Sequence, residues 1–203
     1  MENQLSFSEH DSLKIIQQMI NTAKKEQKDD GKGWIIWGWM LFCASALTIL
    51  NIEFKWFQTF FFWNIFGVGT LLMGLLETIK SLFFPKTKKV KTYTKDIFEK
   101  LNIGFFISIM LIIVSMNIGV SPNKGFPILM NLYGFWILIY ATVLNFKPSM
   151  IGAYIMWALA FTALFVSTFQ HVMLLQALGV LCGYIIPGYI AKKRFNDQSI
   201  GKV

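Results

Sequence analysis

Four polar residues inside otherwise apolar stretches are the candidates for chemistry in this sequence: Glu77, Asn64, Asn117 and Asn131. A carboxylate can carry a proton or bind a cation, and an amide can donate and accept hydrogen bonds between helices. Glu77 precedes Lys80 by one helical turn, so we favour an ion pair between them over a proton or cation site. For the asparagines we favour hydrogen bonds between helices over the lining of a polar pocket.

The sequence holds no spacing of residues that is typical of an enzyme, a metal centre or a cofactor site. His171 lacks a neighbouring His, Cys or acidic residue, and His10, although flanked by Glu9 and Asp11, lacks a second His or a Cys nearby. Hydrolase, metalloprotease and phosphate-loop motifs are missing, and most glycines fall inside apolar runs. Cys43 and Cys182 also lie within apolar runs, so we expect two small packing residues rather than a disulfide. We therefore predict no catalytic residue, no metal and no cofactor.

The composition indicates the medium in which these residues are positioned. Of the 203 residues, 55% are hydrophobic and 15% are charged, and the mean hydropathy is +0.52. Soluble domains have roughly 25% charged residues. A soluble monomer of this length has too little interior for so much apolar surface, and a disordered chain would be more polar. The sequence therefore predicts an integral membrane protein.

Charged residues divide the chain into uncharged runs of helical length. Four runs have 20 to 23 residues, and the last, 148–191, has 44. A membrane-spanning helix needs about 20 residues. The last run therefore fits two helices, with a turn at Phe169–Gln170–His171. The predicted fold is all-α, a polytopic bundle with spans at 34–52, 57–79, 101–119, 128–146, 149–168 and 172–190.

The basic residues predict the orientation of this bundle. Six spans place both termini on one side, and 17 of the 19 basic residues then fall on that side. Only Lys55 and Lys124 fall on the other. Cytoplasmic loops carry an excess of Lys and Arg, so both termini are expected in the cytoplasm. The net charge of +8 is thus first an orientation signal rather than a nucleic-acid footprint.

Outside the 34–190 transmembrane domain, the segment 1–33 is predicted to be cytoplasmic. Residues 8–28 show helical amphipathicity, and Gly31 and Gly33 follow as a hinge. We favour a helix lying on the inner leaflet, where lysines meet anionic lipid. The alternative is that its apolar stripe docks a partner helix or a second copy of the chain.

Two further basic segments are predicted to be cytoplasmic, the loop 80–100 and the tail 191–203. The loop is a candidate interaction surface because five lysines fall within ten of its residues: Lys86, Lys88, Lys89, Lys91 and Lys95. We favour an orientation signal with headgroup contact. Nucleic-acid binding is a weaker alternative, because the loop has no arginine and no RNA-binding motif.

Small residues predict where helices approach closely. Gly179 and Gly183 form a GxxxG pattern on the last span, and Gly188 follows. Glycines at 67, 69 and 74 are expected to act similarly on the second span. Pro187 is expected to kink the last helix. Packing within one chain is favoured over a homo-oligomer.

Several stretches resemble an uncharacterised bacterial family of small six-span integral membrane proteins. They are the blocks 12–20 (SLKIIQQMI), 33–39 (GWIIWGW), 145–153 (NFKPSMIGA) and 184–189 (YIIPGY). The resemblance implies the bacterial cytoplasmic, or inner, membrane and no established activity. In size and layout alone, the chain is also similar to multi-span accessory proteins found beside RNA-targeting CRISPR effectors.

These observations lead to a functional hypothesis with two alternatives. We expect a non-enzymatic accessory or regulatory membrane protein whose basic face meets a cytoplasmic protein or ribonucleoprotein partner and an anionic inner leaflet. One alternative is a channel or transporter for ions or small solutes, using Glu77 and the asparagines. The other, implied by the looser resemblance, is a modulator of an RNA-targeting CRISPR effector.

Overall fold

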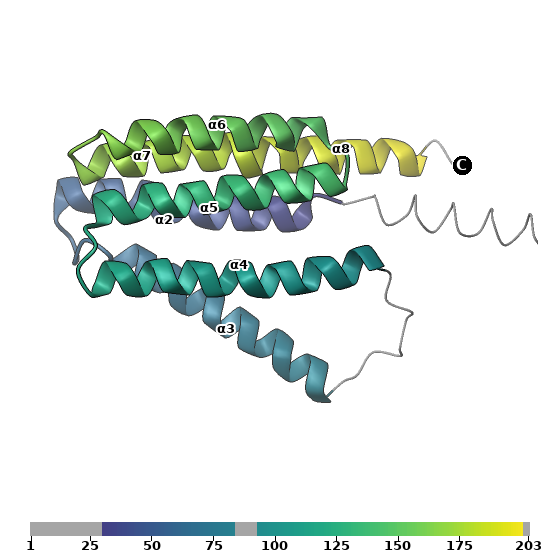
Figure 1. Cartoon of the computed structure of the whole chain (residues 1–203), viewed down its shortest axis with the longest axis horizontal. Helices are drawn as coiled ribbons and strands as arrows, with labels where there is room; N and C mark the ends of the chain where they lie inside the picture. The colour runs from purple at the N-terminus through teal and green to yellow at the C-terminus, as the bar shows by residue number, and fades with distance from the viewer. Residues whose placement is uncertain (1–29, 84–92, 201–203) are drawn as a thin grey trace, which may run out of the picture.

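The chain folds into helices throughout the part that the structure describes. A computed structural model describes residues 30–83 and 93–200, where every regular element is helical. The predicted amphipathic helix at 8–28 lies outside the described residues. The helices other than α3 run back and forth along one axis (Figure 1). The helical elements are α2 (Lys32–Phe54), α3 (Phe61–Phe83), α4 (Tyr93–Asn117), α5 (Pro122–Val143), α6 (Lys147–Leu164), α7 (Phe169–Val180), η1 (Leu181–Ile185) and α8 (Ile186–Ile200).

Four of these helical stretches are long and apolar enough to cross a membrane. They are Lys32–Phe54, Lys100–Asn117, Pro122–Val143 and Phe169–Asp197, the last running through α7, η1 and α8. A shorter apolar stretch, Phe61–Leu72, begins α3. The described chain is therefore all-helical and compatible with a membrane protein.

The helix α5 begins six residues earlier than the sequence predicted. The expected loop around residues 120–127 is short, because Ser121 is extended and Pro122 opens the helix. Proline is favoured at the first helical position, where no intrahelical partner for an N–H exists. Pro127 then lies inside α5 and is buried. Treating Pro127 as a helix boundary was wrong.

The turn between α6 and α7 lies at 165–168, so the prediction of a turn at Phe169–Gln170–His171 was wrong. Those three residues form the first turn of α7. Phe169 packs against the core, with its ring centroid 5.3 Å from that of Phe126 and 5.6 Å from that of Phe60. Burial of this ring outweighs the polarity of its two neighbours.

The last helix contains a π-helical turn, η1, directly before Pro187. The Ile186 N–H donates to the Leu181 carbonyl, five residues back. Proline has no N–H to donate, and its ring crowds the carbonyl four residues before it. A wider turn relieves this crowding while the helix continues. Pro187 was expected to kink the last helix, and the structure has a π-helical turn next to it.

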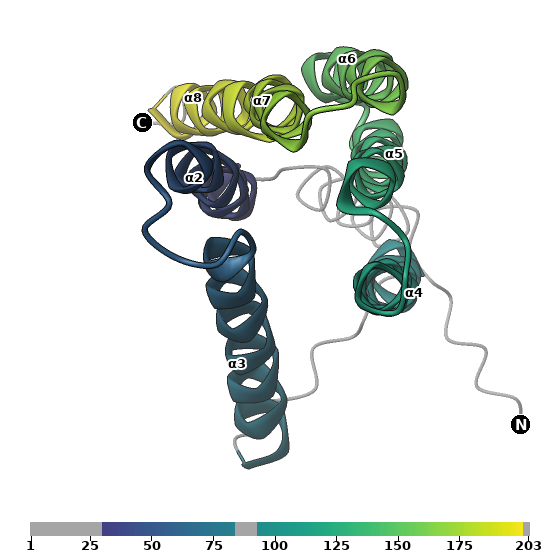
Figure 2. The same cartoon turned by 90° about the vertical axis from the view of Figure 1, so that its left-hand side faces the viewer.

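The helices pack as a compact group with two outlying members. α2 packs against α7 and η1, α5 against α6, and α6 against α7 and η1. α4 packs along α5, whereas α3 packs on α2 and points away from the group (Figure 2). Leu72, Leu76 and Phe83 are accordingly exposed on α3. Such apolar exposure suits lipid rather than water.

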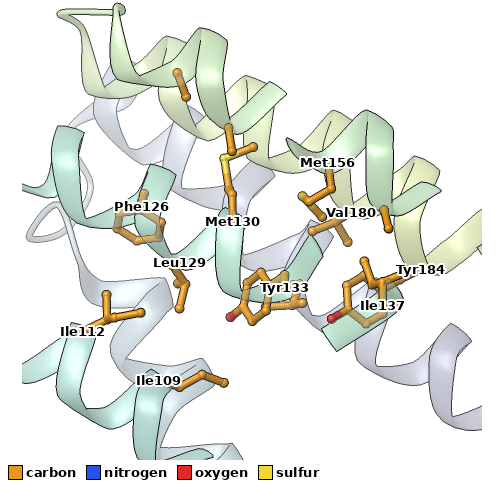
Figure 3. Close-up of a cluster of buried hydrophobic side chains, with 14 of the residues drawn as sticks. Ile109, Ile112, Phe126, Leu129, Met130, Tyr133, Ile137, Met156, Val180 and Tyr184 are labelled. Carbon is orange, nitrogen blue, oxygen red and sulfur yellow. The ribbon is translucent and has the colours of Figure 1, made fainter. Parts of the chain in front are cut away.

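The core lies between α2, α5, α6, α7 and η1. Met130, Ile137 and Met156 are fully buried there and, with Val180 and Tyr184, form the cluster in Figure 3. Long unbranched methionines fill irregular gaps between helices of this kind. This cluster holds the positions of the helices that carry the groups described next.

Candidate functional site: a basic end and a buried polar group

The three candidate asparagines do not line the interior of the bundle. Asn64 on α3, Asn117 on α4 and Asn131 on α5 are all exposed. The side-chain amide of Asn117 donates to the Ile113 carbonyl of its own helix at 2.8 Å. Among the described residues these side chains do not meet, so the pocket alternative receives no support from them.

The remaining polar candidates are only partly described. Glu77 lies in α3 and Lys95 in α4, but their side chains are outside the described residues, as are the side chain of Lys80 and the whole of Lys86, Lys88, Lys89 and Lys91. The ion pair expected between Glu77 and Lys80 stays a prediction.

The three candidate packing glycines lie at close contacts between helices. A Cβ at Gly179 would lie 2.6 Å from Met156 Sδ, and one at Gly183 would lie 2.8 Å from Ile137 Cδ1. A Cβ at Gly188 would lie 2.8 Å from Ile35 Cγ1 on α2. These contacts are within one chain, and the glycines let the last helix approach α2, α5 and α6 closely.

The glycines of the second span behave differently from this expectation. A Cβ at Gly67 or Gly69 would meet no described atom within 4 Å. The prediction that they pack within the chain was wrong for these two positions, because α3 leaves the bundle instead of lying along it (Figure 2). Gly74 lies among the residues whose side-chain surroundings are not described.

Basic side chains from three elements gather at one end of the bundle. We call this set, whose members are all exposed, the basic end: Lys32, Lys147, Lys192, Lys193 and Arg194. It is formed by the start of α2, the start of α6 and the end region of α8, at the right in Figure 1. The Arg194 guanidinium lies 5.2 Å from the centroid of Phe146, so a cation–π contact joins α8 to the α5–α6 turn.

An acidic residue borders the basic end. Asp30 accepts a hydrogen bond from the Lys32 backbone N–H at 3.1 Å, and its carboxylate lies 3.3 Å from Lys32 Nζ. The hydrogen bond, followed by the lysine charge, lowers the pKa of the Asp30 carboxyl below its ordinary value. The carboxylate also stands at the N-terminus of α2, where the helix dipole favours negative charge.

At the opposite end, polar contacts join the ends of neighbouring helices. The Lys124 ammonium donates to the Leu164 carbonyl at the end of α6, at 2.8 Å. Gln170 donates to the Glu53 carboxylate at 3.2 Å, which joins α7 to the end of α2. Asn123 donates to the Ser167 carbonyl in the α6–α7 turn. Lys124 thus satisfies a helix-end carbonyl that has no intrahelical partner.

A row of three buried polar side chains follows one face of α2. Ser45 and Thr48 are fully buried, and their hydroxyls donate to the carbonyls of Leu41 and Ala44 in the same helix. Asn51 ends the row. Its side-chain oxygen accepts from the Phe57 N–H, and its side-chain NH₂ donates to the carbonyls of residues 57 and 58. These hydroxyls and this amide therefore have partners.

Two buried polar groups on the facing helix have no hydrogen-bond partner among the residues that the structure describes. They are both atoms of the Gln176 amide and the hydroxyl of Tyr184. Leaving such a group unpaired costs about 1–3 kcal/mol. The sequence analysis missed Gln176, although an amide within a 44-residue uncharged run was a signal that could have found it.

The Tyr184 ring lies among other aromatic side chains. Its ring centroid lies 6.2 Å from that of Tyr133 at an interplanar angle of 89°, and 4.9 Å from that of Trp34. Figure 3 shows the two tyrosines side by side.

The described residues hold no group of three or more His, Cys, Asp or Glu side chains that could bind a metal ion. Comparison of the chain with protein-family models, curated proteins and solved structures finds no match.

Proposed function

We propose that this chain is a non-enzymatic integral protein of the bacterial cytoplasmic membrane, with six spans and both termini in the cytoplasm. It acts as an accessory or regulatory component that meets a cytoplasmic protein partner through its basic end. The observation that carries the proposal is the gathering of Lys32, Lys147 and the 192–194 cluster, all exposed, at one end of the bundle.

The contrast between the two ends supports the orientation. At the opposite end the basic side chains among the described residues are Lys55 and Lys124, and the Lys124 ammonium donates to the Leu164 carbonyl. Positive residues accumulate on the cytoplasmic side of membrane proteins. The six spans correspond to α2, α3, α4, α5, α6 and the continuous helix from α7 to α8.

The arrangement of the basic end supports contact with an acidic surface. Its charges come from α2, α6 and α8, so they form a surface rather than a line along one helix. Arg194 is held over Phe146, which reduces the side-chain entropy lost on binding. An acidic protein face and the anionic leaflet both suit such a surface, and we assign the partner to the protein class.

A photo-crosslinking amino acid at Lys193 in the full chain tests this function in cells. A protein adduct is expected from position 193, and it should be lost when Lys147, Lys192 and Arg194 are changed to Gln while membrane insertion persists. The same crosslinker at Gln58, at the opposite end, is the matched control.

Three outcomes would contradict the proposed partner. Adducts that are equal from both positions would show no preference for the basic end, and adducts with lipid alone would identify the leaflet as the partner. Loss of the protein adduct after nuclease treatment would point to a ribonucleoprotein instead.

A further inference from the structure

The side-chain amide of Gln176 is buried, and its donors and acceptor are unpaired among the described residues. Its side chain is fully buried in α7, and neither its oxygen nor its nitrogen has a hydrogen-bond partner within the described ranges 30–83 and 93–200. Buried polar groups are hydrogen-bonded in almost all native proteins, to protein or to ordered water. An amide that faces an interior without a protein partner therefore points to a bound molecule.

The register of α2 against the last helix identifies its polar neighbours. Two contacts set this register. Gln170 donates a hydrogen bond to Glu53, so these two residues lie opposite each other. Gly38 packs against Ile185, since a Cβ at Gly38 would lie 2.8 Å from Ile185 Cγ1. The two helices run antiparallel between these points. Gln176 therefore lies at the level of residues 45–48 of α2, where Ser45 and Thr48 are fully buried.

The hydroxyls of Ser45 and Thr48 can accept hydrogen bonds at this level. Each donates its single hydrogen to a carbonyl of α2, at 2.9 Å and 2.7 Å. A hydroxyl that donates still has acceptor lone pairs. The amide of Gln176 supplies donors and an acceptor of its own. A ligand between them must therefore both donate and accept.

The charge of the surroundings restricts the ligand further. The buried polar residues of the described chain are Ser, Thr, Asn and Gln, and none of them is ionised. An ion in this interior would lack a compensating charge, which is costly in a low dielectric. The chemistry thus favours a small neutral molecule with donors and acceptors.

We propose that Gln176, Ser45 and Thr48 form an internal water-binding site between α2 and α7. The bound water donates its two hydrogens to the hydroxyl oxygens of Ser45 and Thr48, and it accepts from the Gln176 NH₂ group. Internal waters make about three hydrogen bonds to buried polar groups and are costly to remove. The site links the first helix of the described bundle to the last one, and it does not depend on the proposed cytoplasmic partner.

Nuclear magnetic resonance of the full chain in nanodiscs, with ¹⁵N-labelled glutamine, tests the site. The side-chain signal that disappears in Gln176→Met identifies Gln176. A magnetisation-transfer cross-peak from water to this NH₂ group is expected. It should be lost in Thr48→Val or Ser45→Ala while the Gln176 signal itself remains. Gln170→Met, in the first turn of α7, is the control and should leave the cross-peak intact.

The proposal fails if the Gln176 signal shows no water cross-peak, or if the cross-peak persists unchanged in both hydroxyl variants. Thermal unfolding provides a second measurement. Because Gln176 and Thr48 share the water, the changes in Tm for Gln176→Met and Thr48→Val are expected to be non-additive in the double variant. Additive changes would also overturn the site.

Discussion

Gly31 and Gly188 lie directly against each other, so the start of α2 meets the last helix through two residues without side chains. A Cβ on Gly31 would collide with the Gly188 carbonyl oxygen. Gly31 also has a φ of +68°, in the left-handed region. The contact fixes where α2 enters the bundle, and it also brings Lys32 and Lys192 to the same end.

We expect Gly31→Ala to destabilise the protein by more than about 2 kcal/mol, from the left-handed backbone and the collision together. Gly33→Ala is the matched control. It lies two residues on, inside α2, where a Cβ meets no atom within 4 Å. Because Ala favours a helix over Gly by about 0.5–1 kcal/mol, the control should be stabilised. Thermal unfolding in detergent measures both, and equal Tm shifts would contradict the contact.

Gly152→Ala should destabilise the protein more than Gly179→Ala. A Cβ at Gly152 would lie 2.6 Å from the Cys182 carbonyl oxygen and 2.9 Å from Gly183 Cα, which are backbone atoms that cannot rotate away. At Gly179 the obstacle is the flexible end of Met156. Overpacking costs about 1–3 kcal/mol, and we expect Gly152→Ala at the upper end. Gly69→Ala, which adjoins open space, is the control, and the reverse order of Tm values would refute the packing.

Changing Lys124 to Met should loosen the α6–α7 turn. The substitution removes the donor to the Leu164 carbonyl and leaves a helix-end acceptor without its partner. We expect a loss of about 0.5–1.5 kcal/mol. Hydrogen–deuterium exchange at residues 165–168 should become faster. Lys55→Met, also exposed, serves as the control, and unchanged exchange in the Lys124 variant would count against the capping role.

Acidification should release the first turn of α2 through Asp30. The pKa of this carboxyl is lowered in the folded state, so its stabilising contribution is present above its ordinary pKa of 3.8. The contribution is lost as the pH falls through the lowered folded value. In the wild type, the NMR signal of the Lys32 backbone amide should therefore shift with pH at values below the ordinary pKa of 3.8. The shift should vanish in Asp30→Asn, and an identical profile in both proteins would disprove the assignment.

Single-cysteine labelling checks the proposed topology. With Cys43→Ser and Cys182→Ala as background, Gln58→Cys should react with an impermeant maleimide in intact cells. Lys193→Cys should react only after the membrane is permeabilised. The opposite pattern would reverse the orientation, and labelling of both positions in intact cells would place them on the same side.

The positions of the helices follow from the sequence largely because charges are costly in an apolar medium. Uncharged runs predict α2 and the long last helix well, but they do not predict the helix boundaries near Pro127 and Phe169. A proline near a helix start and an aromatic ring beside Gln170 have positions that depend on packing, which spacing does not reveal.

The directions of the polar side chains were harder to predict than the helices. In a membrane the outer face of a helix is as apolar as its inner face, so hydrophobic periodicity does not indicate which side is buried. Asn131 was singled out from the sequence and Gln176 was not, but Asn131 is exposed and Gln176 is fully buried. The glycines had the same ambiguity, since Gly183 is packed and Gly69 is not.

The packing of α2 against the last helix has a consequence for biosynthesis. Ribosomes make chains from the N-terminus, so the buried face of α2 emerges long before Gly188 and the helix that covers it. During that interval Ser45 and Thr48 lack their final neighbour, and the membrane or an insertase must shelter them. A nascent chain that stops before residue 169 would keep this face uncovered, and it would be a natural substrate for membrane quality-control proteases.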